Sequence, residues 1–406
     1  MRIFAKRFLY DGVALRYHAD ERKNQEKLYI YIENPRKKLY NILYMYYDKL
    51  YLQKVCPKNK GARTRSAFES NKDGNKSMKI ILDVMGADNS AAELVKGAIL
   101  AKKEYGAELV LVGDATEICD ALTSNGESIN SWEIVPTNDV ITMEDDPISI
   151  RRAHKDSSMA IALRLVADGK GDAMVSAGNT GALFIGATGF VHCIPGVRRA
   201  ALASILPFSK PVLLLDSGAN VEPSVDFLAN FAIIGSLYMK KVMNVEAPKV
   251  GLLNNGAEEH KGTAFYREAH ALLKQTEGID FIGNVEGKDV PYGACDVLVC
   301  DGFTGNILLK TAEGVSKFVM KQISAMFKSD LIGKIAGVLV LKKAKAMKKR
   351  FDVKEYGGAP FLGLAKPVIK AHGNSDARAL KNAIHQAITY AETGVIEEIE
   401  KTMQKA

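Results

Sequence analysis

From Met78 onward, short apolar runs alternate with longer stretches whose apolar residues have helical spacing. Residues 79–83 predict a strand, residues 91–103 predict a helix, and residues 108–112 predict the next strand. Strands that alternate with helices in this way are typical of sheets whose crossovers are helical. The sequence therefore predicts an α/β fold with a mainly parallel, doubly wound sheet. The same criterion predicts an amphipathic helix over residues 376–401.

Further apolar runs predict more strands, most of which are followed by turns rich in small and polar residues. These strands are residues 172–176, 200–206, 212–216, 250–253 and 297–300. A strand that ends in a glycine-rich bend and continues as a helix directs backbone N–H groups at one point, as in the anion sites of α/β proteins. A tight turn without a ligand has the same pattern, so the argument for a site depends on its repetition along the chain.

Two of these turns carry side chains that can donate hydrogen bonds to an anion. The turn at residues 301–306 reads Asp-Gly-Phe-Thr-Gly-Asn and precedes a helix that is predicted to begin at Ile307. The other turn contains Ser176, Asn179 and Thr180 just before a predicted helix. Ordinary capping of that helix by Asn or Thr is the alternative interpretation of the second turn.

A third turn, after the strand at residues 250–253, concentrates charged groups. It carries two carboxylates, an imidazole and an ammonium on the consecutive residues Glu258, Glu259, His260 and Lys261. On a solvated loop these groups would be surface charge only. At the carboxyl edge of a parallel sheet they would lie where ligands bind in such folds, and we expect them there.

Residues 318–351 break the βα rhythm and predict an additional helical segment. Residues 335–341 are apolar, and a basic cluster follows them immediately. This run is too short to cross a bilayer, but an apolar segment beside basic residues can lie on an anionic membrane surface. A helix packed at a subunit interface is an equally good interpretation. The candidate membrane-docking residues are Ile335, Val338, Leu339, Leu341, Lys342 and Lys343.

The net charge of +8 conceals two different compositions. Residues 1–77 contain 18 Lys and Arg against 8 Asp and Glu, with 9 of the 15 tyrosines, and the rest of the chain is close to neutral. Residues 28–32 predict a strand, residues 39–52 have no predicted type, and residues 56–77 are polar and predicted to be disordered. A basic segment with interleaved tyrosines also occurs in nucleic-acid-binding proteins. We favour a poorly ordered extension or a spuriously translated leader, with Met78 as the working start.

Several classes of function are disfavoured by the sequence. The five cysteines show no paired or metal-like spacing, which suits a reducing cytoplasm. No apolar run reaches the roughly 18 residues of a membrane span, and no secretory signal opens the chain. The strand ends lack the G-x-G-x-x-G fingerprint of dinucleotide sites, so we do not expect NAD. No other cofactor and no metal are expected.

Residues 78–406 resemble the bacterial phosphate acyltransferases, the acyl-carrier-protein:phosphate transacylases of phospholipid synthesis. Eight motifs occur in the family's order, at residues 83–88, 176–183, 215–220, 258–262, 283–287, 301–306, 357–360 and 371–375. One such motif is weak evidence, whereas eight in order are specific, and nothing matches in residues 1–77. The chain departs from the family pattern at Ala87, Arg199 and Asn255. None of these departures removes a charged group that we assign to chemistry.

The resemblance implies a three-layer αβα fold, related to those of isopropylmalate dehydrogenases and phosphotransacetylases, and a homodimer. It also implies reversible transfer of a fatty acyl group from acyl carrier protein to inorganic phosphate. The acyl phosphate would then supply the membrane-bound glycerol-3-phosphate acyltransferase in phosphatidic acid synthesis. Family members are cytoplasmic and associate peripherally with the membrane, which favours the membrane interpretation of residues 330–350. No nucleic acid is expected as a partner.

The resemblance and the chemistry together give a set of candidate site residues. Lys261 would hold the phosphate or the developing negative charge, Asn306 would donate to the phosphate or the oxyanion, and His260 would transfer or orient a proton. The candidate phosphate-binding residues are Ser176, Gly178, Asn179, Thr180, Asp301, Gly305 and His372.

Two other functions are carried as alternatives. A phosphotransacetylase that uses acyl-coenzyme A belongs to the same class of enzyme, and its preferred thioester donor would distinguish it. A non-catalytic adaptor that binds lipid phosphate or nucleic acid through its basic segments belongs to a different class. An adaptor would not need so many glycine-rich turns at strand ends.

Overall fold

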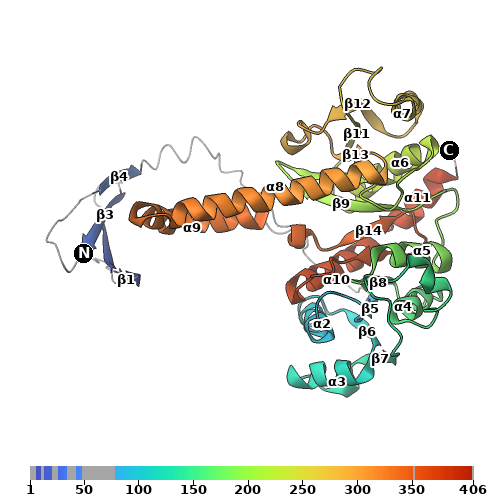
Figure 1. Cartoon of the computed structure of the whole chain (residues 1–406), viewed down its shortest axis with the longest axis horizontal. Coiled ribbons are helices and arrows are strands. Elements are labelled where there is room, and N and C mark those ends of the chain that lie inside the picture. Colours follow the sequence, from blue (N-terminus) through green and yellow to red (C-terminus); the bar gives the residue numbers. More distant parts are fainter. Residues whose placement is uncertain are drawn as a thin grey trace. The chain divides into compact units, whose positions relative to one another are not determined.

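The computed structural model describes residues 6–10, 13–20, 26–33, 43–47, 78–350 and 353–404. The chain divides into two compact units, Met1–Asn75 and Lys76–Ala406. Each unit contains a sheet of its own, and the elements are labelled in Figure 1.

The first unit contains a four-stranded antiparallel sheet. Its strands are β1 (Lys6–Tyr10), β2 (Val13–Asp20), β3 (Glu26–Glu33) and β4 (Leu43–Tyr47), paired in that order. The strand predicted at residues 28–32 is confirmed, since it lies within β3. Residues 56–77, predicted to be disordered, lie outside the described residues. The interpretation of residues 1–77 as an extension or leader stays a prediction.

The second unit is built on an 11-stranded sheet. In chain order its strands are β5 (Lys79–Asp83), β6 (Glu108–Gly113), β7 (Glu133–Pro136), β8 (Ala173–Ser176), β9 (Ala201–Pro207), β10 (Pro211–Leu215), β11 (Lys249–Asn254), β12 (Asp280–Glu286), β13 (Val297–Val299), β14 (Ala359–Leu362) and β15 (Val368–Lys370). Their order across the sheet is β12-β11-β13-β10-β9-β14-β15-β8-β5-β6-β7. Every strand predicted from an apolar run in this unit is present.

The sheet consists of two parallel halves that run in opposite directions. β5, β6, β7, β8 and β15 form one parallel half, and β10, β11, β12 and β13 form the other. Between them, three pairings are antiparallel: β15 with β14, β14 with β9, and β9 with β10. Because three reversals separate the halves, their strands run in opposite directions, and the register places the last residues of β10 and β15, Leu215 and Lys370, only one residue apart along the strand direction. The prediction of a mainly parallel sheet is confirmed, but the reversal was not anticipated.

Ten α-helices and four short 3-10 helices lie among the residues described in the second unit. The α-helices are α2 (Ala91–Tyr105), α3 (Ala115–Ser124), α4 (Ser158–Ala167), α5 (Thr180–Phe190), α6 (Val225–Lys241), α7 (Ala264–Gln275), α8 (Gly302–Lys328), α9 (Leu331–Arg350), α10 (Ala377–Glu392) and α11 (Val395–Met403). The 3-10 helices are η1 (Ile129–Ser131), η2 (Pro147–Arg151), η3 (Val290–Tyr292) and η4 (Val353–Tyr356).

Alternation of side chains along the strands produces the three predicted layers. In β5, Ile80 and Leu82 belong to the core shared with α2, α3, α6, α7, α10 and α11, whereas Ile81 belongs to the core beneath α4 and α5. In β10, Leu213 joins the first core and Leu214 joins a third cluster, under α8. The αβα prediction is therefore confirmed.

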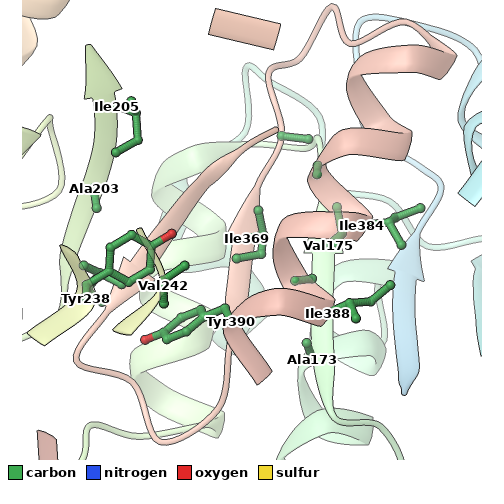
Figure 2. Close-up of a cluster of buried hydrophobic side chains, with 14 of the residues drawn as sticks. Ala173, Val175, Ala203, Ile205, Tyr238, Val242, Ile369, Ile384, Ile388 and Tyr390 are labelled. Carbon is green, nitrogen blue, oxygen red and sulfur yellow. The ribbon is translucent and has the colours of Figure 1, made fainter. Parts of the chain in front are cut away.

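One core layer connects the two halves of the sheet. Figure 2 shows part of it, where Tyr238 of α6 and Tyr390 of α10 meet edge to face with ring centroids 5.6 Å apart. Ile369 of β15 belongs to the same core, and both tyrosines are buried. α6 packs on strands of one half and α10 on strands of the other. The buried aromatic pair thus joins helices that belong to oppositely directed half-sheets.

α8 and α9 form a hairpin whose base alone is buried against the sheet (Figure 1). The buried residues of α8 all lie near its beginning: Gly302, Gly305 and Leu309. Farther out, Gly337 of α9 lets that helix approach Phe327 of α8. The additional helical segment predicted at residues 318–351 is confirmed as part of this longer hairpin. Among the described residues, no helix combines the length and the apolar content that a bilayer crossing requires.

Two predicted helix boundaries were wrong. α8 begins at Gly302 rather than at Ile307, because the Asp301 side chain accepts the backbone N–H of Thr304 and caps the helix there. The C-terminal helix predicted over residues 376–401 is interrupted, because Gly394 adopts the left-handed conformation between α10 and α11.

Gly305 fixes the approach of α8 to the end of β10, and its replacement tests this packing. A Cβ atom there would lie 1.9 Å from the Asp216 carbonyl oxygen, so the helix would have to shift. We predict that Gly305→Ala lowers the free energy of unfolding by about 3 kcal/mol, measured by urea denaturation.

Gly314 of the same helix provides a matched control. A Cβ there meets nothing within 4 Å, so Gly314→Ala should raise the free energy of unfolding by up to about 1 kcal/mol. Equal effects of the two substitutions would contradict the proposed role of Gly305.

Candidate active site

The first of two polar clusters lies in the loop that follows β10. Burial raises the pKa of Asp216, although its carboxylate accepts the backbone N–H groups of Gly218, Ala219 and Asn220. The Asn220 carboxamide also donates to this carboxylate at 2.8 Å and accepts from the Arg199 guanidinium at 2.9 Å. The carboxylate thus holds the loop in a single closed arrangement.

Asp301 joins this region to the neighbouring helix α7. Its carboxylate accepts the backbone N–H and the hydroxyl of Thr304 at 2.8 and 2.7 Å, and Tyr266 of α7 donates to it at 2.5 Å. Burial, together with this bond, raises the pKa of Tyr266. The N–H of Gly305 donates to the Asp301 carbonyl at 2.9 Å. Asp301 and Gly305 are thus occupied in building the start of α8, and their contact with phosphate stays a prediction.

Asn306 and Lys261 differ from these residues because their side-chain donors make no hydrogen bond, although a backbone hydrogen bond and the charge of Lys261 lower the pKa of Glu258. Within residues 78–350 and 353–404, neither the Asn306 carboxamide nor the Lys261 ammonium has a hydrogen-bond or ion-pair partner. Asn306 is exposed and faces the glycine at 218, where a Cβ would lie 3.6 Å from its carboxamide carbon. Lys261 is partly buried. Both residues can therefore accept an anion without breaking an existing bond.

The turn that carries Lys261 is shaped by backbone bonds. The Lys261 N–H donates to the Glu258 carbonyl at 3.0 Å, and Asn254 donates its amide to the Lys261 carbonyl at 3.3 Å. His260 is exposed in the same turn. Because β10, β13 and β11 are adjacent and parallel, this turn starts from the same edge of the sheet as Asp301 and the loop after β10. The structure thus places Lys261, His260 and Asn306 on segments that leave one edge.

The second polar cluster lies at the ends of β5, β8 and β15, where Asp83, Ser176 and Lys370 are register partners. The Ser176 hydroxyl donates to the Asp83 carboxylate at 2.7 Å and accepts the Gly178 N–H at 3.1 Å. Burial raises the pKa of Asp83 to about 6, although hydrogen bonds from Ser158 and Ser176 oppose the shift. The Ser176 hydroxyl and the Gly178 N–H are therefore engaged within the protein.

Asn179 acts as a helix cap, as the alternative interpretation of its turn expects. Its Oδ1 accepts the Ala182 N–H of α5 at 3.1 Å. Its Nδ2 donates to the carbonyls of Thr142 and Met143 at 3.2 and 3.3 Å, which ties the preceding loop to α5. Thr180, the first residue of α5, is partly exposed. Phosphate binding by these residues stays a prediction.

Lys370 is the residue of this cluster that sequence reasoning missed. It is 8% exposed, and its ammonium donates to the carbonyls of Ala177, at 3.3 Å, and Ala371. Burial lowers the pKa of Lys370 to about 8, although the carboxylates of Asp88 and Asp83 oppose this. The available signal in the sequence was a lysine that ends an apolar strand and directly precedes the motif at residues 371–375.

One face of α8 brings the two clusters into electrostatic contact. Burial lowers the pKa of His372, and the charge of Lys310 lowers it further. Lys310 also lowers the pKa of Lys370. Asn306 and Lys310 are four residues apart on a helix and therefore share a face. That face begins beside the loop after β10 and reaches the charged groups at the end of β15.

The predicted meeting of Ser176, Lys261 and Asn306 at one phosphate pocket stays a prediction. Ser176 follows a strand of one half-sheet, and Lys261 follows a strand of the oppositely directed half. The two residues therefore follow strands that point in opposite directions, and the charge of Lys310 on α8 acts on Lys370 at the end of β15. In the part of the chain that the structure describes, no group of three or more His, Cys, Asp or Glu side chains is arranged to hold a metal ion.

The raised pKa of Asp83 gives a pH dependence of stability. Between the ordinary value of 3.8 and the folded value of about 6, the native state holds a proton that the unfolded chain releases. The free energy of unfolding therefore falls by about 3 kcal/mol from this group as pH rises through that interval. We predict that Asp83→Asn removes this fall, so urea unfolding at about pH 4 and about pH 7 should show a relative gain for the variant. Asp120→Asn, at an exposed helix position, is the control, and parallel pH profiles of wild type and Asp83→Asn would refute the assignment.

Comparisons with known proteins agree with these motifs. The family model described as "Fatty acid synthesis protein" matches residues 78–398. A phosphate acyltransferase of Clostridioides difficile is 44% identical over 331 residues, which cover 81% of this chain and 97% of that relative. A phosphate acyltransferase of Brevibacillus brevis is 43% identical over 331 residues, covering 81% of this chain and 98% of that relative.

Solved structures support the fold. A phosphotransacetylase from Streptococcus pyogenes has a TM-score of 0.54 and 20% identity, covering 78% of this chain and 94% of that one. The EutD phosphotransacetylase from Staphylococcus aureus has a TM-score of 0.51 and 17% identity, with the same coverage of 78% and 94%. The fold is thus shared with phosphotransacetylases. The matching family model and the similar relatives establish that the chain belongs to the phosphate acyltransferase family and is an acyltransferase.

Proposed function

We propose that this acyltransferase moves a fatty acyl group reversibly from acyl carrier protein to inorganic phosphate. The product, an acyl phosphate, would serve phospholipid synthesis. The observation that carries the proposal is the pair of unengaged donors, Lys261 and Asn306, in a chain whose relatives are named phosphate acyltransferases. An amide and an ammonium that lack protein partners are suited to hold phosphate and a developing oxyanion.

The reaction requires no protein nucleophile. A phosphate oxygen attacks the carbonyl carbon of the thioester, the C–S bond breaks, and the carrier leaves as a thiolate. Phosphate is nucleophilic without further activation, and a thiol with a pKa of about 8.5 leaves readily as its anion. The protein must therefore bring the reactants together, exclude water and stabilise the charge that develops on the carbonyl oxygen.

We assign a role in the reaction to each candidate side chain according to whether its polar atoms already form hydrogen bonds within the protein. Lys261 binds the phosphate or the developing charge, and Asn306 donates its amide to the phosphate or the oxyanion. His260, exposed beside Lys261, orients or transfers a proton, as does His372 at the end of the second cluster. The glycine-rich turns around them form the anion cradle. The proposed chemistry requires neither a cofactor nor a metal.

We propose that the protein is a homodimer and a cytoplasmic enzyme that associates with the membrane, and the exposed residues of the hairpin support the first and last of these points. On α8, exposed apolar side chains form a face that a second copy would cover: Phe303, Ile307, Val315, Phe318 and Val319. On α9, Val338, Leu339 and Leu341 are exposed and the basic pair Lys342 and Lys343 follows them, while Ile335 is partly buried. We propose that this part of α9 rests on the membrane surface, close to the glycerol-3-phosphate acyltransferase that would consume the product.

The two alternative functions differ from the proposed one in the thioester donor or in the class of protein. A coenzyme A-dependent phosphotransacetylase has the same fold, and the structural neighbours carry that name. A non-catalytic adaptor would leave Lys261 and Asn306 without a chemical role. Phosphate-dependent release of free thiol from acyl-carrier-protein thioester, compared with the coenzyme A thioester, distinguishes all three. Thiol release from neither donor would overturn the proposed function.

Loss of either unengaged donor should slow the reaction strongly. We predict that Lys261→Ala and Asn306→Ala each lower turnover by about 100-fold, the scale for losing one oxyanion donor. Acyl phosphate formation from acyl-carrier-protein thioester is the measurement. Lys240→Ala, which removes an exposed lysine of α6, should keep the wild-type rate. Wild-type turnover in both site variants, shown to be folded by circular dichroism, would remove these assignments.

The hairpin surface has two testable interpretations. If α9 contacts lipid, Val338→Glu places a charge in the apolar contact, and recovery of the full chain with anionic vesicles on flotation should fall several-fold. Ile129→Glu, at an exposed apolar position of η1, should float as the wild type does. Equal flotation of all three proteins, with a lower mass of Val338→Glu in sedimentation, would instead show a subunit interface.

A further inference from the structure

The hairpin differs in charge from the rest of its unit. Residues 302–350 contain 11 Lys and Arg against 2 Asp and Glu, whereas the other residues of 78–406 contain 26 against 37. The net charges favour approach of an acidic partner to the basic hairpin over the acidic remainder of the unit. This asymmetry indicates that the hairpin is the part of the unit to which an acidic partner would bind.

Four of the basic residues form a single line along α8. Lys310, Lys317, Lys321 and Lys328 are separated by seven, four and seven residues, so they lie within about 40° of one another around the helix. The line is about 27 Å long. All four lysines are exposed, and we refer to them as the lysine stripe.

The lysine stripe is poorly compensated by acidic groups. Lys310 pairs with Glu313 at 3.3 Å, and Glu313 is the sole acidic residue of α8. Lys317, Lys321 and Lys328 have no acidic partner among the residues that the structure describes. A merely solvated helix face commonly interleaves charges of both signs, so that neighbours three or four residues apart attract. Here the positive charge of the lysine stripe is not neutralised within the protein and can attract an acidic binding partner.

The lysine stripe also starts at the candidate site. Lys310 follows Asn306 by one helical turn, and its charge acts on both Lys370 and His372. Lys317, the next member, also lowers the pKa of His372. A partner seated on the lysine stripe would therefore end at the proposed reaction centre. Membrane lipid has no reason to reach that point, whereas a protein that carries the acyl thioester must reach it.

We propose that the lysine stripe is the docking surface for an acidic carrier protein that delivers the acyl thioester. This inference rests on the proposed function and names the part of the molecule that recognises the donor. The exposed apolar side chains of α8 near its middle lie on a neighbouring face, with Phe318, Val315 and Val319 about 80°, 140° and 180° around the helix from Lys310. Phe303 lies in line with the lysine stripe, at its end nearest the candidate site. Docking on the lysine stripe and pairing of two copies can therefore occur together.

The test separates docking from chemistry by using two donors. The full chain, with the double substitution Lys317→Glu/Lys321→Glu, is assayed for phosphate-dependent thiol release from acyl-carrier-protein thioester and from a neutral pantetheine thioester of the same acyl chain. We expect kcat/KM for the carrier thioester to fall about tenfold or more at low ionic strength, with little change in kcat. The pantetheine thioester should react at the wild-type rate. The wild type should lose its preference for the carrier as salt is added.

A charge-matched control is Lys96→Glu/Lys240→Glu, which reverses two exposed lysines on α2 and α6. It should keep the wild-type kcat/KM for both donors. An unchanged kcat/KM for the carrier thioester in the lysine stripe variant, or an equal loss with both donors, would overturn the docking proposal. So would loss of flotation with anionic vesicles while carrier kinetics stay normal, because the lysine stripe would then be a lipid contact. A wild-type protein that releases no thiol from either donor would refute the proposed function itself.

Discussion

The close approach of two backbones, at the beginning of α8 and after β10, is the constraint on which the candidate site depends. Gly302 donates its N–H to the Asn220 carbonyl at 2.7 Å, and no side chain separates Gly305 from the Asp216 carbonyl. Contact between main chains leaves little freedom in the position or direction of the helix. The direction of α8 in turn places Asn306 beside the loop after β10 and its next turn near His372.

The reversal at the centre of the sheet gives α8 its importance. In an open parallel sheet, ligands bind beyond the carboxyl ends of the strands, all at one edge. Here β9 and β14 separate two halves whose strands run in opposite directions, so polar loops leave the sheet in both directions. The first turns of α8 link these loops, because the charge of Lys310 acts on Lys370 and His372. The buried pair of Tyr238 and Tyr390 keeps the same halves together on the opposite face.

The sequence was sufficient to predict the three layers, but not the direction in which the strands of each half-sheet run. Strands buried on both faces appear as continuous apolar runs, and every run that predicted a strand in residues 78–406 is a strand in the structure. Side-chain periodicity is the same for either strand direction, so the reversal at β9 and β14 left no mark in the pattern. Helix ends were missed for a related reason, since the roles of Asp301 and Gly394 depend on backbone conformation that spacing does not encode.

Residue type predicted which groups could bind an anion, but not which were already engaged. Ser176 and Asn179 have the right chemistry, yet their donors bond to Asp83 and to loop carbonyls. Lys370 is not conspicuous in the sequence, because a lysine at the end of an apolar strand usually reaches solvent through its flexible stem. Only the register of β5, β8 and β15 shows that it is buried between carbonyls and two carboxylates.

The hairpin is fixed to the sheet at its base only, so its far end has more freedom to move than its beginning. α8 is about 40 Å long, and its buried residues all lie near one end. Bending of about 10° beyond Leu309 would carry the tip of α8 through about 5 Å and leave Asn306 in place. The far end of the hairpin can therefore follow an uneven or moving surface while the backbone around Asn306 stays in place.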